Sequence, residues 1–160
     1  MTIKVGDKVP DIALKTMTAE GPVEITSAEL FGGKKVVLFA LPGAFTPTCS
    51  SKHLPGYIGH ADALRAKGVD TIACLSVNDA FVMGAWGNDQ GVGDRVLMLA
   101  DGAAAFNEAM GLTIDLSAGG MGVRSRRYAM IVDDGIVSHL AIEEGRAFDV
   151  SSAESVMSAL

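Results

Sequence analysis

The chain has 160 residues, a formal net charge of −6 and 49% apolar residues, which suits a single globular domain over residues 1–160. Its basic residues cluster densely only between Arg124 and Arg127, so it lacks the basic surface that nucleic acid requires. The longest strongly apolar run, Val36 to Leu41, is far below the roughly 18–20 residues of a membrane span, and residues 1–5 show no secretion signal. We therefore expect a cytoplasmic protein without membrane or nucleic-acid partners.

The first part of the chain predicts an N-terminal β-hairpin and a central strand. Strands are expected over Ile12–Met17 and Val23–Ile25, joined by a turn at Glu20–Pro22. A short helix over Ser27–Phe31 follows, with a hydroxyl residue available as its cap. The run Lys35–Leu41 is apolar without alternation, which is typical of a central strand covered on both faces.

The rest of the chain alternates helices and strands. The expected elements are a helix over about Pro47–Lys67, a strand over Val69–Val77, a helix over Asp79–Trp86, a strand over Val96–Leu99, a helix over Ala103–Met110, strands over Ser125–Val132 and Ile136–Ile142, and a helix from Ser151 to Leu160. Pro55-Gly56 should kink or interrupt the longest helix. This order predicts an α/β fold with a central mixed β-sheet, parallel crossovers and flanking helices.

The segment from Pro42 to Ser50, Pro-Gly-Ala-Phe-Thr-Pro-Thr-Cys-Ser, lies between the most apolar strand and the longest helix. Ligands of open α/β sheets bind at the carboxyl ends of strands. Thr46 suits the N-cap and Pro47 the first helical position, so Cys49 falls third in the helix. The free N–H groups and the helix dipole there favour a thiolate, the nucleophilic form of cysteine. By position alone, an inert buried thiol is an equal alternative.

The same segment resembles the peroxidatic motif of peroxiredoxins, P-x-x-x-T-x-x-C, in the form of the type II, or peroxiredoxin-5-like, subfamily. The similarity covers nearly the whole chain and includes, in the family's order, the segments Lys52–Tyr57, Ser76–Asp79, Phe81–Met83, Ala100–Gly102 and Arg124–Tyr128. It implies a thioredoxin-like fold and reduction of hydrogen peroxide and organic hydroperoxides by Cys49, which becomes a sulfenic acid. No metal, haem or flavin cofactor is implied.

The resemblance also assigns roles to other residues. It implies that the Thr46 hydroxyl holds the peroxide and the sulfur, that Pro42 shields the site from water, and that Arg127 is the remaining member of the family's catalytic residues. Because neighbouring residues of a strand face opposite sides, we expect Arg126 at the surface, and Arg124 has at most a supporting role.

Three features bear on how the reaction is completed. His53, four residues after Cys49, poses the alternative of a Cys–His dyad, although a structural role is favoured. Cys74 lies in a buried-type strand and is expected to be inert rather than a resolving cysteine. Some relatives carry a resolving cysteine in the segment matching Phe148–Ser152, which has none here. We therefore expect a one-cysteine cycle, with glutathione and glutaredoxin or thioredoxin as the external reductant.

Three rival functions stay open at this point. A thioredoxin-like disulfide oxidoreductase would need a C-x-x-C pair, but Thr46 occupies the first of those positions. A cysteine hydrolase would need a histidine base within reach of Cys49, and a non-catalytic binding or holdase protein would need no reactive thiol. Peroxide consumption with an added thiol separates the peroxidase from all three. Relatives often pair through loops matching Phe45, Thr46 and Asn78–Met83, so we expect a homodimer.

Overall fold

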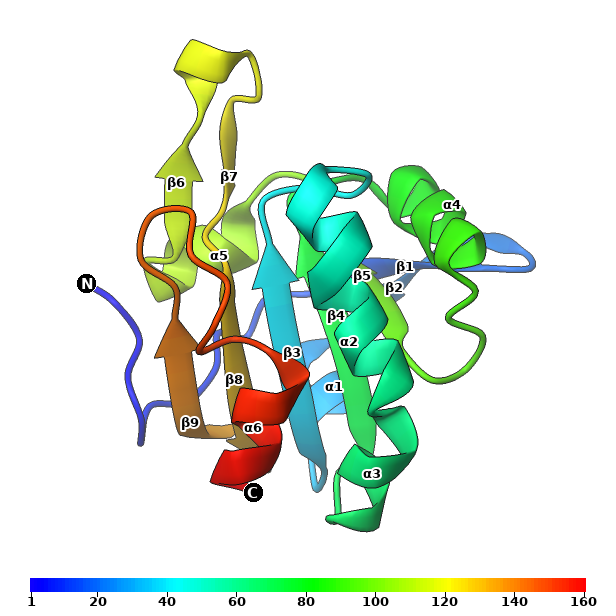
Figure 1. The fold of residues 1–160 in the computed structure, drawn as a ribbon, viewed down its shortest axis with the longest axis vertical. Helices are drawn as coiled ribbons and strands as arrows, with labels where there is room; N and C mark the ends of the chain where they lie inside the picture. Colours follow the sequence, from blue (N-terminus) through cyan, green and yellow to red (C-terminus); the bar gives the residue numbers. More distant parts are fainter.

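A seven-stranded mixed β-sheet forms the centre of the protein in a computed structural model that describes residues 1–160 (Figure 1). The strand order is β2-β1-β5-β4-β3-β8-β9, in which β3, β4 and β5 are parallel and every other pairing is antiparallel. The strands are β1 (Leu14–Thr18), β2 (Gly21–Ile25), β3 (Lys35–Leu41), β4 (Thr71–Ser76), β5 (Leu97–Ala100), β8 (Tyr128–Asp133) and β9 (Ile136–Ile142). This is the mixed sheet with parallel crossovers that the sequence predicts.

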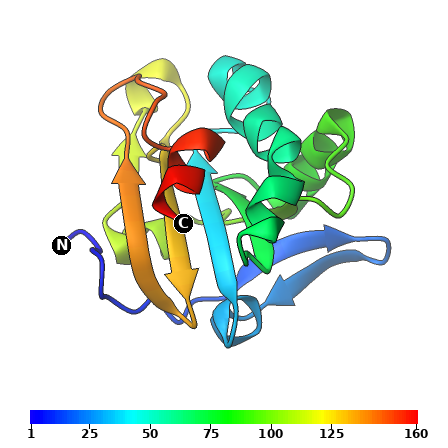
Figure 2. The same cartoon turned by 60° about the horizontal axis from the view of Figure 1, so that its bottom comes forward.

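Helices cover both faces of this sheet (Figures 1 and 2). The helices are α1 (Ser27–Phe31), α2 (Leu54–Gly59), α3 (Ala61–Ala66), α4 (Ala80–Gln90), α5 (Ala105–Met110) and α6 (Ala153–Ala159). Residues of α2, α3, α4 and α6 share one core cluster, whereas α1 and α5 contribute to the cluster on the opposite face. None of these helices has the length and apolarity needed to cross a membrane.

Strand β3 shows why the apolar run in the sequence does not alternate. Its side chains at Val37, Phe39 and Leu41 join the core under α2–α4, and the intervening side chains join the core under α1 and α5. All are fully buried, which stabilises the fold by roughly 1.5–3 kcal/mol for each large apolar side chain. The predicted central strand, covered on both faces, is confirmed. It ends at Leu41, so Pro42 follows directly at its carboxyl end.

The predicted N-terminal hairpin is confirmed as β1–β2, with Thr18 paired to Gly21 across the turn. Gly21 has a φ of +104°, a value that favours glycine. β1 also pairs with β5 at Lys15↔Ala100, so the hairpin extends the sheet beyond β5 (Figure 2).

The predicted strand over Ser125–Val132 is confirmed from Tyr128 onward as β8, but its first residues lie outside β8, because the chain changes sheets there. β7 (Val123–Ser125) pairs with β6 (Thr113–Asp115), a strand that the sequence did not predict, and the two form a hairpin projecting past the main sheet (Figure 1). A 3-10 turn, η2 (Ser117–Gly119), closes its tip. The N–H of Arg126 donates to the Leu112 carbonyl, next to the last β6–β7 pair at Thr113↔Ser125, and β8 begins two residues later at Tyr128.

The predicted helix over Pro47–Lys67 is present but divided. After Pro47 and Thr48 come a π-helical turn, η1 (Cys49–His53), then α2 and α3, which are separated at His60. The irregularity expected at Pro55-Gly56 therefore lies one turn earlier, in η1.

Candidate active site

Cys49 lies where the chain enters its longest helical segment, beyond the carboxyl end of β3. The helical hydrogen bonds begin at the Thr46 carbonyl, which accepts from the Ser50 N–H at 2.9 Å. Thr46 thus occupies the predicted N-cap position, but its hydroxyl donates to the Gly43 carbonyl at 2.6 Å instead of capping the helix. Cys49 is almost completely buried, with 1% of its surface exposed.

The loop before Cys49 is fixed by long-range contacts. The Asn78 side-chain oxygen accepts from the Ala44 N–H at 3.0 Å and from the Ser76 hydroxyl at 2.7 Å. A Cβ at Gly43 would lie 2.8 Å from a guanidinium nitrogen of Arg124, so a larger residue there would displace the Arg124 side chain. The backbone at Phe45 has a φ of +64°, a strained value that costs about 1–3 kcal/mol in a non-glycine residue. Strain of this kind persists because the surroundings hold the loop in one shape.

Arg127 is the guanidinium that reaches the sulfur. Its Nη2 donates to Cys49 Sγ at 3.1 Å and its Nη1 donates to His53 Nδ1 at 2.8 Å. The ring of Phe148 lies 6.0 Å from the guanidinium carbon, within the range of a cation–π contact. A hydrogen bond from a cation to sulfur favours the thiolate, so the arrangement suits a nucleophilic cysteine.

His53 supports Arg127 and is not available as a base for Cys49. Its Nε2 donates to the Ser151 carbonyl at 3.1 Å, so the Nδ1 lone pair accepts from Arg127. Burial, and then the positive charge of Arg127, lower the pKa of His53 from 6.5 to about 3. The ring is therefore neutral near pH 7, as this pattern of hydrogen bonds requires. The geometry favours the structural alternative over the Cys–His dyad.

Comparison with known proteins identifies the family. The Redoxin family model matches residues 4–157. Peroxiredoxin-2E-2, chloroplastic, of Oryza sativa is 57% identical over 164 residues, covering 99% of this chain and 73% of that protein. The crystal structure of reduced Prx3 in complex with H2O2 from Vibrio vulnificus superposes with a TM-score of 0.95 at 56% identity, covering 99% of each chain. The chain belongs to the peroxiredoxin family.

Membership confirms the predicted family, the thioredoxin-like fold and the class of activity: this peroxiredoxin is a thiol peroxidase, an oxidoreductase that acts on peroxides. A second relative, Peroxiredoxin-2E, chloroplastic, of Arabidopsis thaliana, is 53% identical over 163 residues, covering 99% of this chain and 70% of that protein. The likeness therefore extends over nearly the whole chain.

A loop between β9 and α6 closes this peroxiredoxin site, and sequence reasoning missed its organising residue, Glu143. One carboxylate oxygen of Glu143 accepts from the Ser151 hydroxyl at 2.6 Å, the Ser151 N–H at 2.9 Å and the Asp149 N–H at 2.7 Å. Burial by itself would raise the pKa of Glu143, but these hydrogen bonds outweigh it and lower the pKa. In the sequence, nothing distinguishes Glu143 from its exposed neighbour Glu144.

The Ser151 carbonyl connects that loop to the helix carrying Cys49. It accepts from His53 Nε2 and from the Tyr57 hydroxyl, the latter at 2.7 Å. Burial raises the pKa of Tyr57 well above 10, so the hydroxyl keeps its proton and donates. Arg127, His53 and the loop thus form one continuous hydrogen-bonded network next to the sulfur.

The π-helical turn explains how the chain tolerates Pro55. In this register Leu54 N–H donates to the Cys49 carbonyl, and the next donor, to the Ser50 carbonyl, would be residue 55. Proline has no N–H, and the Gln90 side chain donates to that carbonyl instead, at 3.2 Å. Trp86 Nε1 donates to the Ser50 hydroxyl at 3.1 Å. Helix α4 therefore completes the hydrogen bonding of the segment that carries Cys49.

The two other arginines of the cluster differ from Arg127 in their contacts. Arg124 donates to the Pro42 carbonyl at 3.2 Å and to the Met121 carbonyl at 2.9 Å, which agrees with a supporting role. Arg126 does not lie at the surface as expected. It is half-buried, donates to the Glu143 carbonyl at 3.3 Å and lines a cavity beside Pro42, because the break between β7 and β8 removes the strict alternation of a strand.

Proposed function

We propose that residues 1–160 form one thiol peroxidase domain in which Cys49 is the nucleophile that reduces hydrogen peroxide and small organic hydroperoxides. The observation that carries this assignment is the 3.1 Å hydrogen bond from Arg127 Nη2 to Cys49 Sγ inside a buried site. Taking an ionic group out of water is costly unless a charged partner accompanies it. Arg127 provides that partner, so the buried sulfur can be held as a thiolate.

In the proposed reaction the Cys49 thiolate attacks the terminal oxygen of the peroxide and forms the S–O bond of a sulfenic acid. The O–O bond breaks, and the leaving oxygen departs with the electron pair and takes up a proton to become water or an alcohol. Negative charge grows on that oxygen in the transition state, where fixed hydrogen-bond donors lower the barrier most. Arg127, which already donates to Cys49 Sγ, supplies a forked donor of this kind beside the sulfur.

Thr46 and Pro42 have complementary proposed roles. The Thr46 hydroxyl donates its hydrogen bond to the Gly43 carbonyl. The lone pairs of the hydroxyl oxygen are therefore free to accept a hydrogen bond from the O–H of the peroxide. Pro42 has no N–H and lines the cavity next to Arg127, where it keeps an apolar surface towards the site. Excluding water in this way strengthens the electrostatic effect of Arg127.

We further propose a one-cysteine cycle. Cys74 is fully buried within β4 and both cysteines are free, while the loop segment Phe148–Ser152 has no thiol. An external thiol would displace water from the sulfenic acid to give a mixed disulfide, and a second thiol would release Cys49. Glutathione with glutaredoxin, or thioredoxin, would supply those electrons.

The test is the intact mass of the protein after one equivalent of hydrogen peroxide. We expect the mass of one added oxygen on Cys49, followed by a glutathione adduct when glutathione is supplied and by its removal with glutaredoxin. A loss of two hydrogens, with Cys49 and Cys74 in one crosslinked peptide, would refute the one-cysteine cycle.

Dimer formation and location complete the proposal. Phe45 and Phe81 are 55% and 68% exposed, and large exposed aromatic side chains are typical of interface residues. We propose a homodimer through the loops that carry them, in the cytoplasm, where free cysteines stay reduced. Sedimentation of a Phe81→Arg variant tests the interface: a monomer supports it, and an unchanged mass contradicts it.

A further inference from the structure

A cavity of about 640 Å³ lies beside the proposed nucleophile, and it is far larger than hydrogen peroxide needs. Pro42, Thr48 and Arg127 form the side next to the Cys49 segment, and the β6–β7 hairpin and the loop after β9 form the rest. Cavities that hold small organic molecules have volumes of about 300–1,000 Å³. The size therefore points to an organic reactant.

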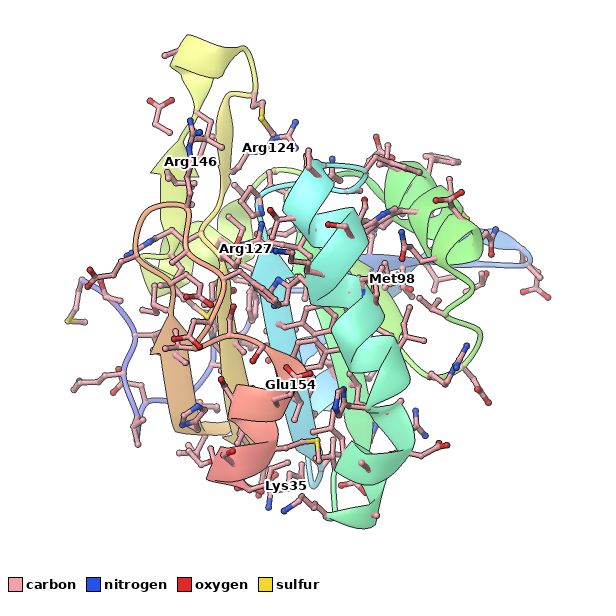
Figure 3. The ribbon with its side chains drawn as sticks, in the orientation of Figure 1. Lys35, Met98, Arg124, Arg127, Arg146 and Glu154 are labelled. Atoms are coloured by element: carbon pink, nitrogen blue, oxygen red, sulfur yellow. The ribbon has the colours of Figure 1, made fainter.

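The charge of this cavity is unusual for so acidic a chain. Four of the six arginines, Arg124, Arg126, Arg127 and Arg146, gather at this end of the molecule, and Figure 3 shows three of them there. None of the four makes an ion pair, since the three ion pairs of the protein involve Lys4, Lys15 and His60. Unpaired guanidinium groups beside a cavity are suited to binding an anion.

Two of these arginines are available to a ligand. Arg127 is used by Cys49 and His53, and Arg124 by two backbone carbonyls. Arg126 makes only one side-chain hydrogen bond, at 3.3 Å, to a backbone carbonyl, and the exposed Arg146 makes none. Both line the cavity.

The two carboxylates in the cavity wall form no ion pair with these arginines and accept hydrogen bonds from other groups. Glu143 accepts three hydrogen bonds from Ser151 and Asp149, and Asp115 accepts from the Ser117 N–H at 2.9 Å. The remaining wall includes the apolar side chains of Ile114, Leu116 and Met121. A ligand that suits this cavity combines an anionic group with an aliphatic body.

We infer that Arg126 and Arg146 bind the carboxylate of an organic molecule that reacts at Cys49. The carboxylate would accept from the two guanidinium groups while the aliphatic part lies on Ile114, Leu116 and Met121, directing the reactive end towards Arg127 and the sulfur. Two reactants of a peroxidase can carry that chemistry, an organic hydroperoxide with a carboxylate or a thiol reductant with a carboxylate. The inference rests on the proposed role of Cys49.

Matched pairs of reactants test this inference in both half-reactions. In the first arm, linoleic acid hydroperoxide and its methyl ester oxidise the reduced protein, at concentrations below micelle formation. In the second arm, glutathione and its dimethyl ester reduce the sulfenic acid. We expect the acid to react about tenfold faster than the ester, or more, in one arm, because a charge-assisted contact is lost in the ester. If the acid reacts faster than the ester in the first arm, the hydroperoxide carries the bound carboxylate; if it does so in the second arm, the thiol reductant carries it.

The variants assign the preference to the two arginines. In the double variant Arg126→Gln with Arg146→Gln, the acid-to-ester rate ratio should fall towards one. Arg95→Gln is the matched control, because Arg95 is exposed, donates to one backbone carbonyl and lies outside the cavity. It should keep the wild-type ratio.

Two results would overturn the inference: equal rates for acid and ester in both arms, or a preference that survives the double substitution. Hydrogen peroxide consumption by the wild type is measured alongside. If the wild type still consumes hydrogen peroxide, the inference about the two arginines has failed while the proposed peroxidase function stands. If Cys49→Ser consumes hydrogen peroxide as fast as the wild type, the role of Cys49 is wrong and this inference falls with it.

Discussion

Cys49 and Cys74 are buried to the same extent, at 1% and 0% exposure, yet their surroundings are chemically opposite. Cys49 lies at a helix start with a guanidinium on its sulfur. Cys74 lies in the middle of β4, paired in register with Phe39 of β3 and Met98 of β5. Burial raises the pKa of the Cys74 thiol well above 9, so it stays protonated and unreactive. Burial alone therefore does not determine whether a thiol is reactive. The polar groups that contact the sulfur determine it.

The backbone around the two cysteines differs in the same way. The ladder bonds of β3, β4 and β5 satisfy the backbone at Cys74 without help from side chains. The turn containing Cys49 depends on Arg127, Gln90 and Trp86, which come from distant parts of the chain. A segment held by side chains can be altered by single substitutions, and the following predictions use that difference.

The largest effect is expected from replacing the sulfur itself. Cys49→Ser should lower peroxide reduction by roughly 10³-fold or more, because a hydroxyl is a much weaker nucleophile than a thiolate. Cys74→Ser should retain most of the activity. Peroxide consumption by stopped flow measures both, with circular dichroism to show that each variant is folded. Equal losses of activity in the two variants would contradict the assignment of Cys49 as the reactive cysteine and Cys74 as the inert one.

The next largest effect is expected from the guanidinium. Arg127→Gln should lower the rate of peroxide reduction by about 10²–10³-fold, because it removes the charged donor from both the sulfur and the transition state. Alkylation of Cys49 by iodoacetamide near pH 7 should slow as well, since less thiolate is present. Arg95→Gln, at an exposed arginine remote from the site, is the control. An Arg127→Gln variant with wild-type alkylation would mean that Arg127 does not stabilise the thiolate.

A moderate effect, with a distinct pH dependence, is expected from His53→Gln. Because folding lowers the pKa of His53 to about 3, the unfolded chain binds the extra proton between about pH 6.5 and 3. The free energy of unfolding should thus fall with decreasing pH, by up to about 1.4 kcal/mol per pH unit. His53→Gln should flatten this slope between pH 6.5 and 5, above the range where Glu143 titrates. Urea unfolding at several pH values measures it, and an unchanged slope would contradict the assignment.

The smallest effect is expected from the hydrogen bond that replaces the missing N–H of Pro55. Gln90→Ala leaves the Ser50 carbonyl without that donor and should cost about 1 kcal/mol of stability. Amide hydrogen exchange should speed up in η1 and not in β4. Asp89→Ala, at the exposed neighbouring position, should change neither. Faster exchange throughout β4 would mean that the two regions are not held independently.

The sequence alone determines the elements whose signals are local. The apolar run of β3 predicts a doubly covered strand, and the hydroxyl, proline and cysteine at Thr46, Pro47 and Cys49 predict a helix start with a thiol in its first turn. The family motif adds Pro42 and Arg127 as partners. The strand and helix-start signals are readable because each depends only on neighbouring residues of the chain, whereas Arg127 is known only through the family resemblance.

Only the tertiary structure decides which groups meet at the sulfur. The change of sheets between β7 and β8 gives Arg126 and Arg127 different surroundings, and strand alternation does not predict that break. The Glu143–Ser151 contacts and the Gln90 bond to η1 join residues with no distinctive local pattern. Such contacts depend on where separate elements pack against one another. A linear sequence gives the residue types that can pair, whereas the packed fold selects the pairs that form.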